Sequence, residues 1–154
     1  HGVADFLRGG SFETRDSVRT LSNAMDVGDP SNLERIKWLY RSDDALRLDV
    51  EGDWVSDEDT VRAIANVHRG QGYVMDPHTA VAYAVAKRKH VGAAPVVILS
   101  TAHPAKFPEV VEGAICEPVS VPDKILSARQ SNELMSVIPP DLGRLKELLD
   151  GGPQ

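Results

Sequence analysis

Hydrophobic residues recur at helical spacing in several stretches of the chain, and most of these stretches begin at a helix-capping residue near a proline. Ser31 and Glu34 form a capping box after Pro30, and Ser56 and Asp59 form a second one. The first box predicts a helix whose apolar face holds Leu33, Ile36 and Tyr40. The second predicts a helix that ends at Gly70 and whose inner face holds Val61, Ile64, Ala65 and His68.

Three more helices follow from the same signals. Asp76 and Pro77 predict a helix with Ala80, Val81, Ala84 and Val85 on one face and basic residues at 87–90, which suit the negative end of its dipole. Pro104 begins another helix, which carries Phe107, Val110 and Val111, and the internal Pro108 predicts an irregular first turn. The last helix contains Leu142, Leu145, Leu148 and Leu149.

Between these helices lie short apolar runs that predict strands. Residues 96–99 read Val-Val-Ile-Leu, which is typical of a central strand of a parallel sheet covered by helices on both faces. Residues 73–75 and 137–138 are two further candidates. Strands that alternate with helices indicate an α/β fold, an open and mainly parallel sheet flanked by helices. We expect residues 1–154 to form a single α/β unit of this kind.

Composition narrows the class of protein. The chain has 154 residues, a formal net charge of −6 and one cysteine, Cys116. Its length suffices for an ordinary hydrophobic core, and its acidic balance argues against nucleic acid or an anionic membrane as the main partner. No apolar run approaches the roughly 20 residues of a membrane span, and a single cysteine fits a reducing compartment. The chain begins with His1 and no signal-peptide pattern follows, so we expect that another segment precedes it.

Two segments could carry chemistry, because ligands of open α/β sheets bind where strands end and helices begin. They are residues 96–104, which bring Ser100, Thr101 and His103 to a turn, and residues 73–79, which bring Asp76 and Thr79 to a helix start. Helix capping explains most of these residues equally well. A Ser-His-Asp triad is disfavoured because no G-x-S-x-G elbow is present, and the histidines are too scattered for a metal site. The Arg8-Gly9-Gly10-Ser11 turn lacks the lysine of a P-loop.

Three blocks, in this order, resemble threonine synthase. The first runs from Thr20-Leu21-Ser22-Asn23-Ala24-Met25-Asp26 to Pro30-Ser31-Asn32-Leu33-Glu34-Arg35. The second is Gly72-Tyr73-Val74-Met75-Asp76-Pro77-His78-Thr79-Ala80-Val81-Ala82, and the third is Ser100-Thr101-Ala102-His103-Pro104-Ala105-Lys106-Phe107. The resemblance covers about residues 1–115 and is to the carboxy-terminal part of the family. Threonine synthases are fold-type II enzymes that use pyridoxal 5'-phosphate (PLP) to convert O-phospho-L-homoserine and water to L-threonine and phosphate.

The resemblance implies roles for two residues. Thr101 matches the position whose hydroxyl donates to the pyridine nitrogen of PLP, and His103 is a second cofactor-binding candidate for which a purely structural role stays open. The Schiff-base lysine and the phosphate-binding loop of the family are expected upstream, so no catalytic residue and no metal ligand is assigned in this segment. We therefore expect the isolated chain to be inactive.

The resemblance leaves open which reaction the parent enzyme catalyses and which partner this chain binds. The parent could be another fold-type II lyase or dehydratase, or the chain could be a non-catalytic binding module. By resemblance, the substrate is the small molecule O-phosphohomoserine, the compartment is the cytoplasm, and neither nucleic acid nor membrane is a partner. Self-association, or pairing with the missing amino-terminal part, would bury apolar surface that a severed segment exposes.

Overall fold

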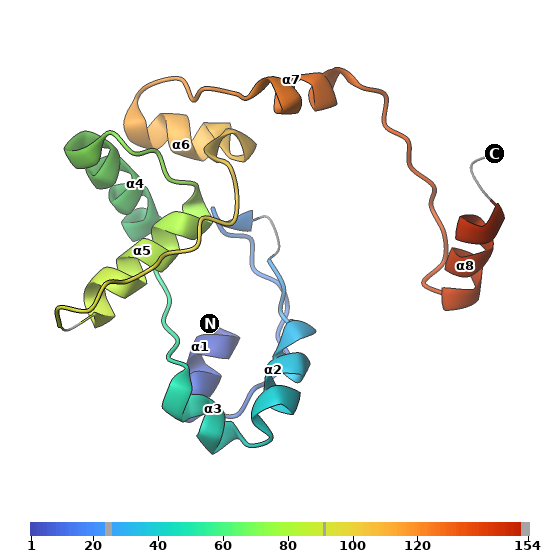
Figure 1. The fold of residues 1–154 in the computed structure, drawn as a ribbon, viewed down its shortest axis with the longest axis horizontal. Helices are drawn as coiled ribbons and strands as arrows, with labels where there is room; N and C mark the ends of the chain where they lie inside the picture. Colours follow the sequence, from blue (N-terminus) through green and yellow to red (C-terminus); the bar gives the residue numbers. More distant parts are fainter. Residues whose placement is uncertain (24–25, 91, 152–154) are drawn as a thin grey trace. The chain divides into compact units, whose positions relative to one another are not determined.

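The computed structural model describes residues 1–23, 26–90 and 92–151, and within these ranges the regular structure is helical. The chain divides into two compact units, His1–Ser120 and Val121–Gln154. The first contains α1 (Gly2–Leu7), α2 (Asn32–Tyr40), α3 (Asp43–Asp49), α4 (Asp57–Gln71), α5 (Pro77–Lys89), the 3-10 helix η2 (Pro104–Lys106) and α6 (Pro108–Ile115). The second contains α7 (Asp123–Gln130) and α8 (Leu142–Gly151) (Figure 1).

The predicted parallel sheet is wrong, because no strand occurs among the residues that the structure describes. Residues 96–99 form no regular element, and Val97 and Leu99 are 84% and 74% exposed. Residues 73–75 lead directly into α5, and Met75 packs among helices instead of in a sheet. A strand is stabilised by the N–H and C=O groups of a neighbouring strand, and the described segments provide no such neighbour. The β-branched composition of residues 96–99 therefore does not by itself produce a sheet.

The predicted helices are confirmed, with changes at their ends. Ser56 accepts a hydrogen bond from the Asp59 N–H at 3.1 Å and caps α4, which continues past the expected Gly70 to Gln71 and has Gly72 as its C-cap. Gly72 has φ +67°, a left-handed conformation that glycine adopts without strain. Ser31 precedes α2, but its backbone is already helical and its side chain makes no capping bond. The helix expected from Pro104 begins only at Pro108, as α6, and η2 forms the irregular turn before it.

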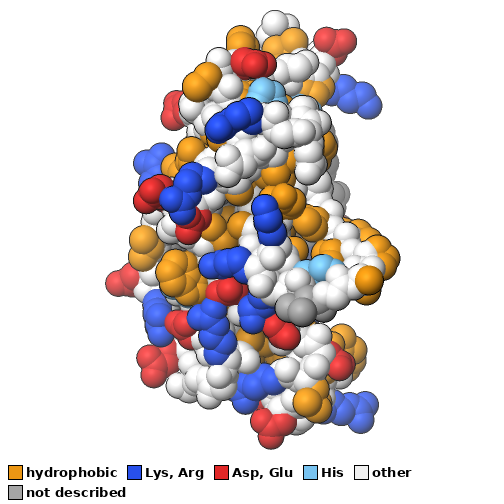
Figure 2. Space-filling model, turned by 90° about the vertical axis from the view of Figure 1, so that its left-hand side faces the viewer, with side chains coloured by type: hydrophobic (Ala, Val, Ile, Leu, Met, Phe, Trp, Pro, Cys, Tyr) orange, Lys and Arg blue, Asp and Glu red, His pale blue; other side chains and the backbone are white. Residues whose placement is uncertain are grey.

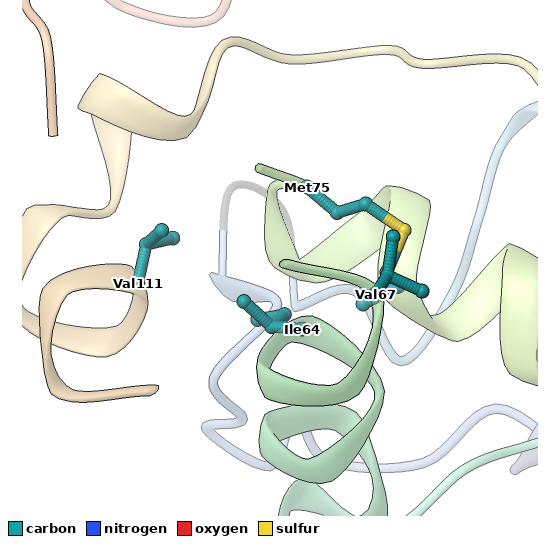
Figure 3. Packing of buried hydrophobic residues seen from close by; sticks show 5 residues of the cluster. Ile64, Val67, Met75 and Val111 are labelled. Carbon is teal, nitrogen blue, oxygen red and sulfur yellow. The ribbon is translucent and has the colours of Figure 1, made fainter. Parts of the chain in front are cut away.

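Two small cores stabilise the first unit. One joins α4, α5 and α6 through Ile64, Val67, Met75, Ala80 and Val111 (Figure 3). The other joins α1, α2 and α3 through Phe6, Leu33 and Leu46. Full burial of a side chain such as Ile64 contributes about 1.5–3 kcal/mol relative to its exposure. The inner face of α4 differs from the expected one, since Val67 is buried whereas Val61, Ala65 and His68 are only partly so.

An ionic contact at Asp53 connects the ends of two helices. Its carboxylate pairs with Arg8, just after α1, and with Arg88 of α5, whose Nη2 lies 3.3 Å from Oδ2. The Trp54 backbone N–H also donates to Oδ1 at 2.9 Å. This hydrogen bond, followed by the Arg88 and Arg8 charges, lowers the pKa of Asp53 below its ordinary value of 3.8, although desolvation opposes the shift.

Three further features of the described residues concern surface charge, burial in the second unit and helix length. Acidic and basic side chains are interspersed on the face shown in Figure 2, so that face presents no continuous patch of one charge. In the second unit, none of the described residues is buried, and Leu142 and Leu149 of α8 are 81% and 72% exposed. None of the helices described is both long enough and apolar enough to cross a bilayer.

Candidate functional site

The start of α5 is organised by a buried carboxylate. Asp76 is fully buried and adopts an extended backbone that lets its side chain turn back over the first helical turn. Oδ1 accepts hydrogen bonds from the backbone N–H groups of His78 at 2.9 Å and Thr79 at 3.4 Å. Pro77 occupies the first helical position, where its missing N–H leaves no donor unsatisfied. The sequence Asp-Pro-His-Thr thus encodes a rigid helix start.

A hydroxyl of this turn connects α5 to the segment that follows residues 96–99. Thr79 Oγ1 donates to Asp76 Oδ2 and lies 3.2 Å from Ser100 Oγ. A hydroxyl has one proton, and a carboxylate is the stronger acceptor, so the Thr79 proton belongs to Asp76. Ser100 must then donate its proton to Thr79. The three side chains form a directed chain of hydrogen bonds from Ser100 through Thr79 to Asp76.

Thr101 follows this chain immediately and is exposed. No residue in the described part of the protein hydrogen-bonds to its hydroxyl. The neighbouring Ser100 is held through Thr79, so the backbone that carries Thr101 is attached to the start of α5. The structure therefore presents a hydroxyl on a restrained backbone with its donor and acceptor capacity available.

His103 is occupied on one of its two ring nitrogens. Nδ1 accepts the backbone N–H of Ala105 at 3.1 Å and so caps η2. An accepting Nδ1 is unprotonated, and the neutral ring then carries its proton on Nε2. His103 is exposed, so this Nε2–H can reach a ligand. The structure thus gives His103 a capping role and leaves it one free donor.

His78, the second histidine of the region, has a hydrogen-bond acceptor beside its Nδ1, whereas the Nδ1 of His103 has a donor beside it. The Nδ1 of His78 lies 3.0 Å from Asp76 Oδ1, and its ring packs against Phe107 with centroids 5.1 Å apart. Phe107 follows η2, so both ends of residues 100–107 contact the first turn of α5: Ser100 through Thr79, and Phe107 through His78. The two segments predicted to carry chemistry therefore form one site.

The sequence did not predict the Thr79–Ser100 contact, although it selected both residues as candidates. They are separated by 21 positions, and no sequence signal fixes such a pairing. A hydrolytic triad is also not formed within the described residues, because Asp76 bonds to His78 and the Nδ1 of His103 is used by Ala105. No group of three potential metal ligands occurs in that part of the chain.

A groove of about 500 Å³ between α4 and α5 is a separate feature. Ala63, Val67 and Ala84 contribute apolar lining, and Arg62, Lys87 and Arg88 contribute charge. Arg62 already pairs with Glu58 and Asp59, and Arg88 pairs with Asp53. Two of these three cationic side chains are therefore paired with protein carboxylates, and the start of α5 is the better candidate.

Comparisons with known proteins find similarity to threonine synthases. A family model described as "Threonine synthase, C-terminal" matches residues 79–149. The chain is 36% identical to the threonine synthase of Serratia marcescens over 98% of its own length and 35% of that protein. The identity to the threonine synthase of Escherichia coli is 32%, over 96% of this chain and 34% of that protein. The chain thus spans about a third of these curated relatives.

Solved structures agree with the sequence comparisons. The crystal structure of threonine synthase from Escherichia coli superposes with a TM-score of 0.79 and 31% identity, over 97% of this chain and 35% of that one. The structure of PLP-bound threonine synthase from Brucella melitensis gives a TM-score of 0.68 and 29% identity, over 94% of this chain and 37% of that one. The family match begins at Thr79, just after Asp76 and His78, and covers the rest of α5 and residues 100–107. In both sequence and fold, the chain therefore matches the carboxy-terminal part of threonine synthases.

Proposed function

We propose that this chain is the carboxy-terminal segment of a PLP-dependent threonine synthase, which converts O-phospho-L-homoserine and water to L-threonine and phosphate. The observation that carries the proposal is the match of nearly the whole chain to about a third of several threonine synthases, one of them PLP-bound. The site at the start of α5 supplies hydrogen-bonding groups suited to a small polar ligand.

The residues present fit the proposed cofactor. PLP, when bound, supplies the electron sink that such a reaction needs. Thr101 would donate its hydroxyl to the pyridine nitrogen, and its exposed, unpaired hydroxyl is available for this bond. A neutral hydroxyl leaves the nitrogen unprotonated, whereas a carboxylate would favour the pyridinium. His103 would add its Nε2–H as a second donor to the cofactor.

The isolated chain is proposed to lack turnover, since none of its lysines is assigned to holding the cofactor covalently. Its apolar surface supports a further proposal, that it self-associates or pairs with an amino-terminal part of the enzyme. Val97, Leu99 and Leu134 are among its exposed apolar side chains, and Leu134 is 98% exposed. Light scattering of the purified chain should then give a mass above 16.7 kDa, and adding the amino-terminal part should replace this species by a complex of the two.

The test of the proposed function uses the complete enzyme that carries this segment. The enzyme should release phosphate from O-phosphohomoserine and show PLP absorbance. Thr101→Val should shift that absorbance and lower kcat, while Thr101→Ser, which keeps the donor, should have a small effect. An enzyme that binds no PLP and releases no phosphate would refute the activity, and an unchanged spectrum in Thr101→Val would refute the role of Thr101.

A further inference from the structure

The paired side chains of Asp76 and His78 have no role in the proposed function so far. Asp76 is fully buried, and Nδ1 of His78 lies 3.0 Å from its Oδ1. His78 itself is 27% exposed, so its ring lies between a buried carboxylate and the surface. Burial of a carboxylate costs free energy of folding unless several hydrogen-bond donors satisfy it, so the His78 ring is part of what allows Asp76 to be buried.

The contacts of Asp76 determine which nitrogen of His78 carries the proton. Oδ1 already accepts from the backbone N–H groups of His78 and Thr79, and Oδ2 accepts from the Thr79 hydroxyl. The carboxylate thus acts as an acceptor throughout, and a ring nitrogen 3.0 Å away must be a donor. The neutral ring of His78 therefore has its proton on Nδ1. Its Nε2 carries a lone pair and has no hydrogen-bond partner among the described residues.

The orientation of the ring is fixed from two sides. Asp76 holds Nδ1, and the Phe107 ring lies against the imidazole at an interplanar angle of 55°. Asp76 is also bonded to Thr79, which contacts Ser100 beside Thr101. Two histidines therefore belong to this one site with complementary capacities: His103 offers an N–H donor at Nε2, and His78 offers an acceptor at Nε2.

We propose that His78 is a ligand-binding residue of this site, and that its Nε2 accepts a hydrogen bond from the hydroxyl group of L-threonine. Asp76 is the positioning residue, because it sets the tautomer that makes Nε2 an acceptor. The inference rests on the proposed function, in which the oxygen of that hydroxyl comes from water. The same Nε2 would orient this water by accepting one of its protons in a hydrogen bond.

The tautomer can be measured on the chain itself. Nitrogen-15 NMR of the 154-residue protein with labelled histidine should show a protonated Nδ1 and an unprotonated Nε2 for His78 at a pH where the ring is neutral. Asp76→Asn should shift the ring toward a mixture of tautomers, because an amide can donate as well as accept. A His78 ring with its proton on Nε2 in the unsubstituted protein would overturn the proposal.

A pair of ligands tests the hydroxyl contact in the complete holoenzyme. L-Threonine and L-2-aminobutyrate share a carbon skeleton and differ in the hydroxyl, and their binding can be followed by the cofactor absorbance. The enzyme should prefer L-threonine by about 2- to 10-fold, the worth of one ordinary hydrogen bond. His78→Asn keeps a donor for Asp76 but loses Nε2, so the preference should disappear. His78→Gln can place an amide oxygen near the position of Nε2 and should retain part of it.

The outcomes separate the two proposals. An unchanged preference in His78→Asn would overturn the role of His78 and leave the proposed function intact. Failure of the unsubstituted enzyme to bind either amino acid would contradict the proposed function as well. Circular dichroism of His78→Asn should match that of the unsubstituted enzyme, since the first turn of α5 keeps its carboxylate cap.

Discussion

Replacement of Asp76 by alanine should destabilise the first unit much more than the loss of an ordinary helix cap. The carboxylate is fully buried and serves two backbone N–H groups, the Thr79 hydroxyl and the His78 ring. Alanine would remove all four acceptor contacts at once. It would leave the Thr79 hydroxyl, in a nearly closed environment, with Ser100 as its remaining partner.

The expected loss can be worked from these contacts. A capping residue contributes about 1 kcal/mol, and a buried hydrogen bond to a charged group contributes roughly 1.5–3 kcal/mol. The cost of burying the carboxylate disappears with the side chain and offsets part of this sum. We therefore expect Asp76→Ala to lower the free energy of unfolding by about 2–4 kcal/mol. Asp76→Asn keeps one acceptor oxygen and should cost about 1–2 kcal/mol.

Urea unfolding of the full chain, followed by circular dichroism, measures both variants. Ser56→Ala is the matched control, because Ser56 caps α4 through one hydrogen bond to the Asp59 N–H in an exposed position. It should cost about 0.5–1 kcal/mol. If Asp76→Ala were no more destabilising than Ser56→Ala, the buried carboxylate network would not stabilise α5, and the reasoning that places Ser100 and His78 through it would fail.

Two further predictions concern the hydrophobic core and the loss of stability at acidic pH. Ile64 is fully buried between α4, α5 and α6, so Ile64→Ala should lower the free energy of unfolding by about 2–5 kcal/mol. Val97 is 84% exposed, and Val97→Ala should change the free energy of unfolding by less than about 0.5 kcal/mol in the same urea titration. Asp53 has a lowered pKa in the folded chain, so its contribution is fully present above about pH 4 and is lost as the pH falls through its folded value. The urea midpoint of Asp53→Asn should therefore fall less steeply below about pH 4 than that of the unsubstituted chain, and equal slopes would contradict a lowered pKa of Asp53 in the folded chain.

The sequence by itself determined most of the helix starts. Ser56 and Asp76 are caps whose side chains bond to nearby backbone N–H groups, and such contacts within three residues are readable as short motifs. Pro77 begins α5 for the same local reason, whereas Pro108, expected inside a helix from Pro104, is itself the first residue of α6. The family could also be recognised from the sequence, because its blocks around Asp76 and Thr101 are long and occur in order.

Only the tertiary structure decided how these local pieces combine. The apolar run at 96–99 has strand composition, yet a strand forms only beside another strand, and the described chain supplies none. The contacts of the site could not be predicted from the sequence either, since Thr79 contacts Ser100 and His78 contacts Phe107 across sequence separations that no short motif spans. The tautomers of His78 and His103 follow from these contacts, because the partner of one ring nitrogen fixes the proton on the other. Local hydrogen bonds are determined by residues that are neighbours in the sequence, whereas strand pairing and the chemistry of a site depend on groups that folding brings together.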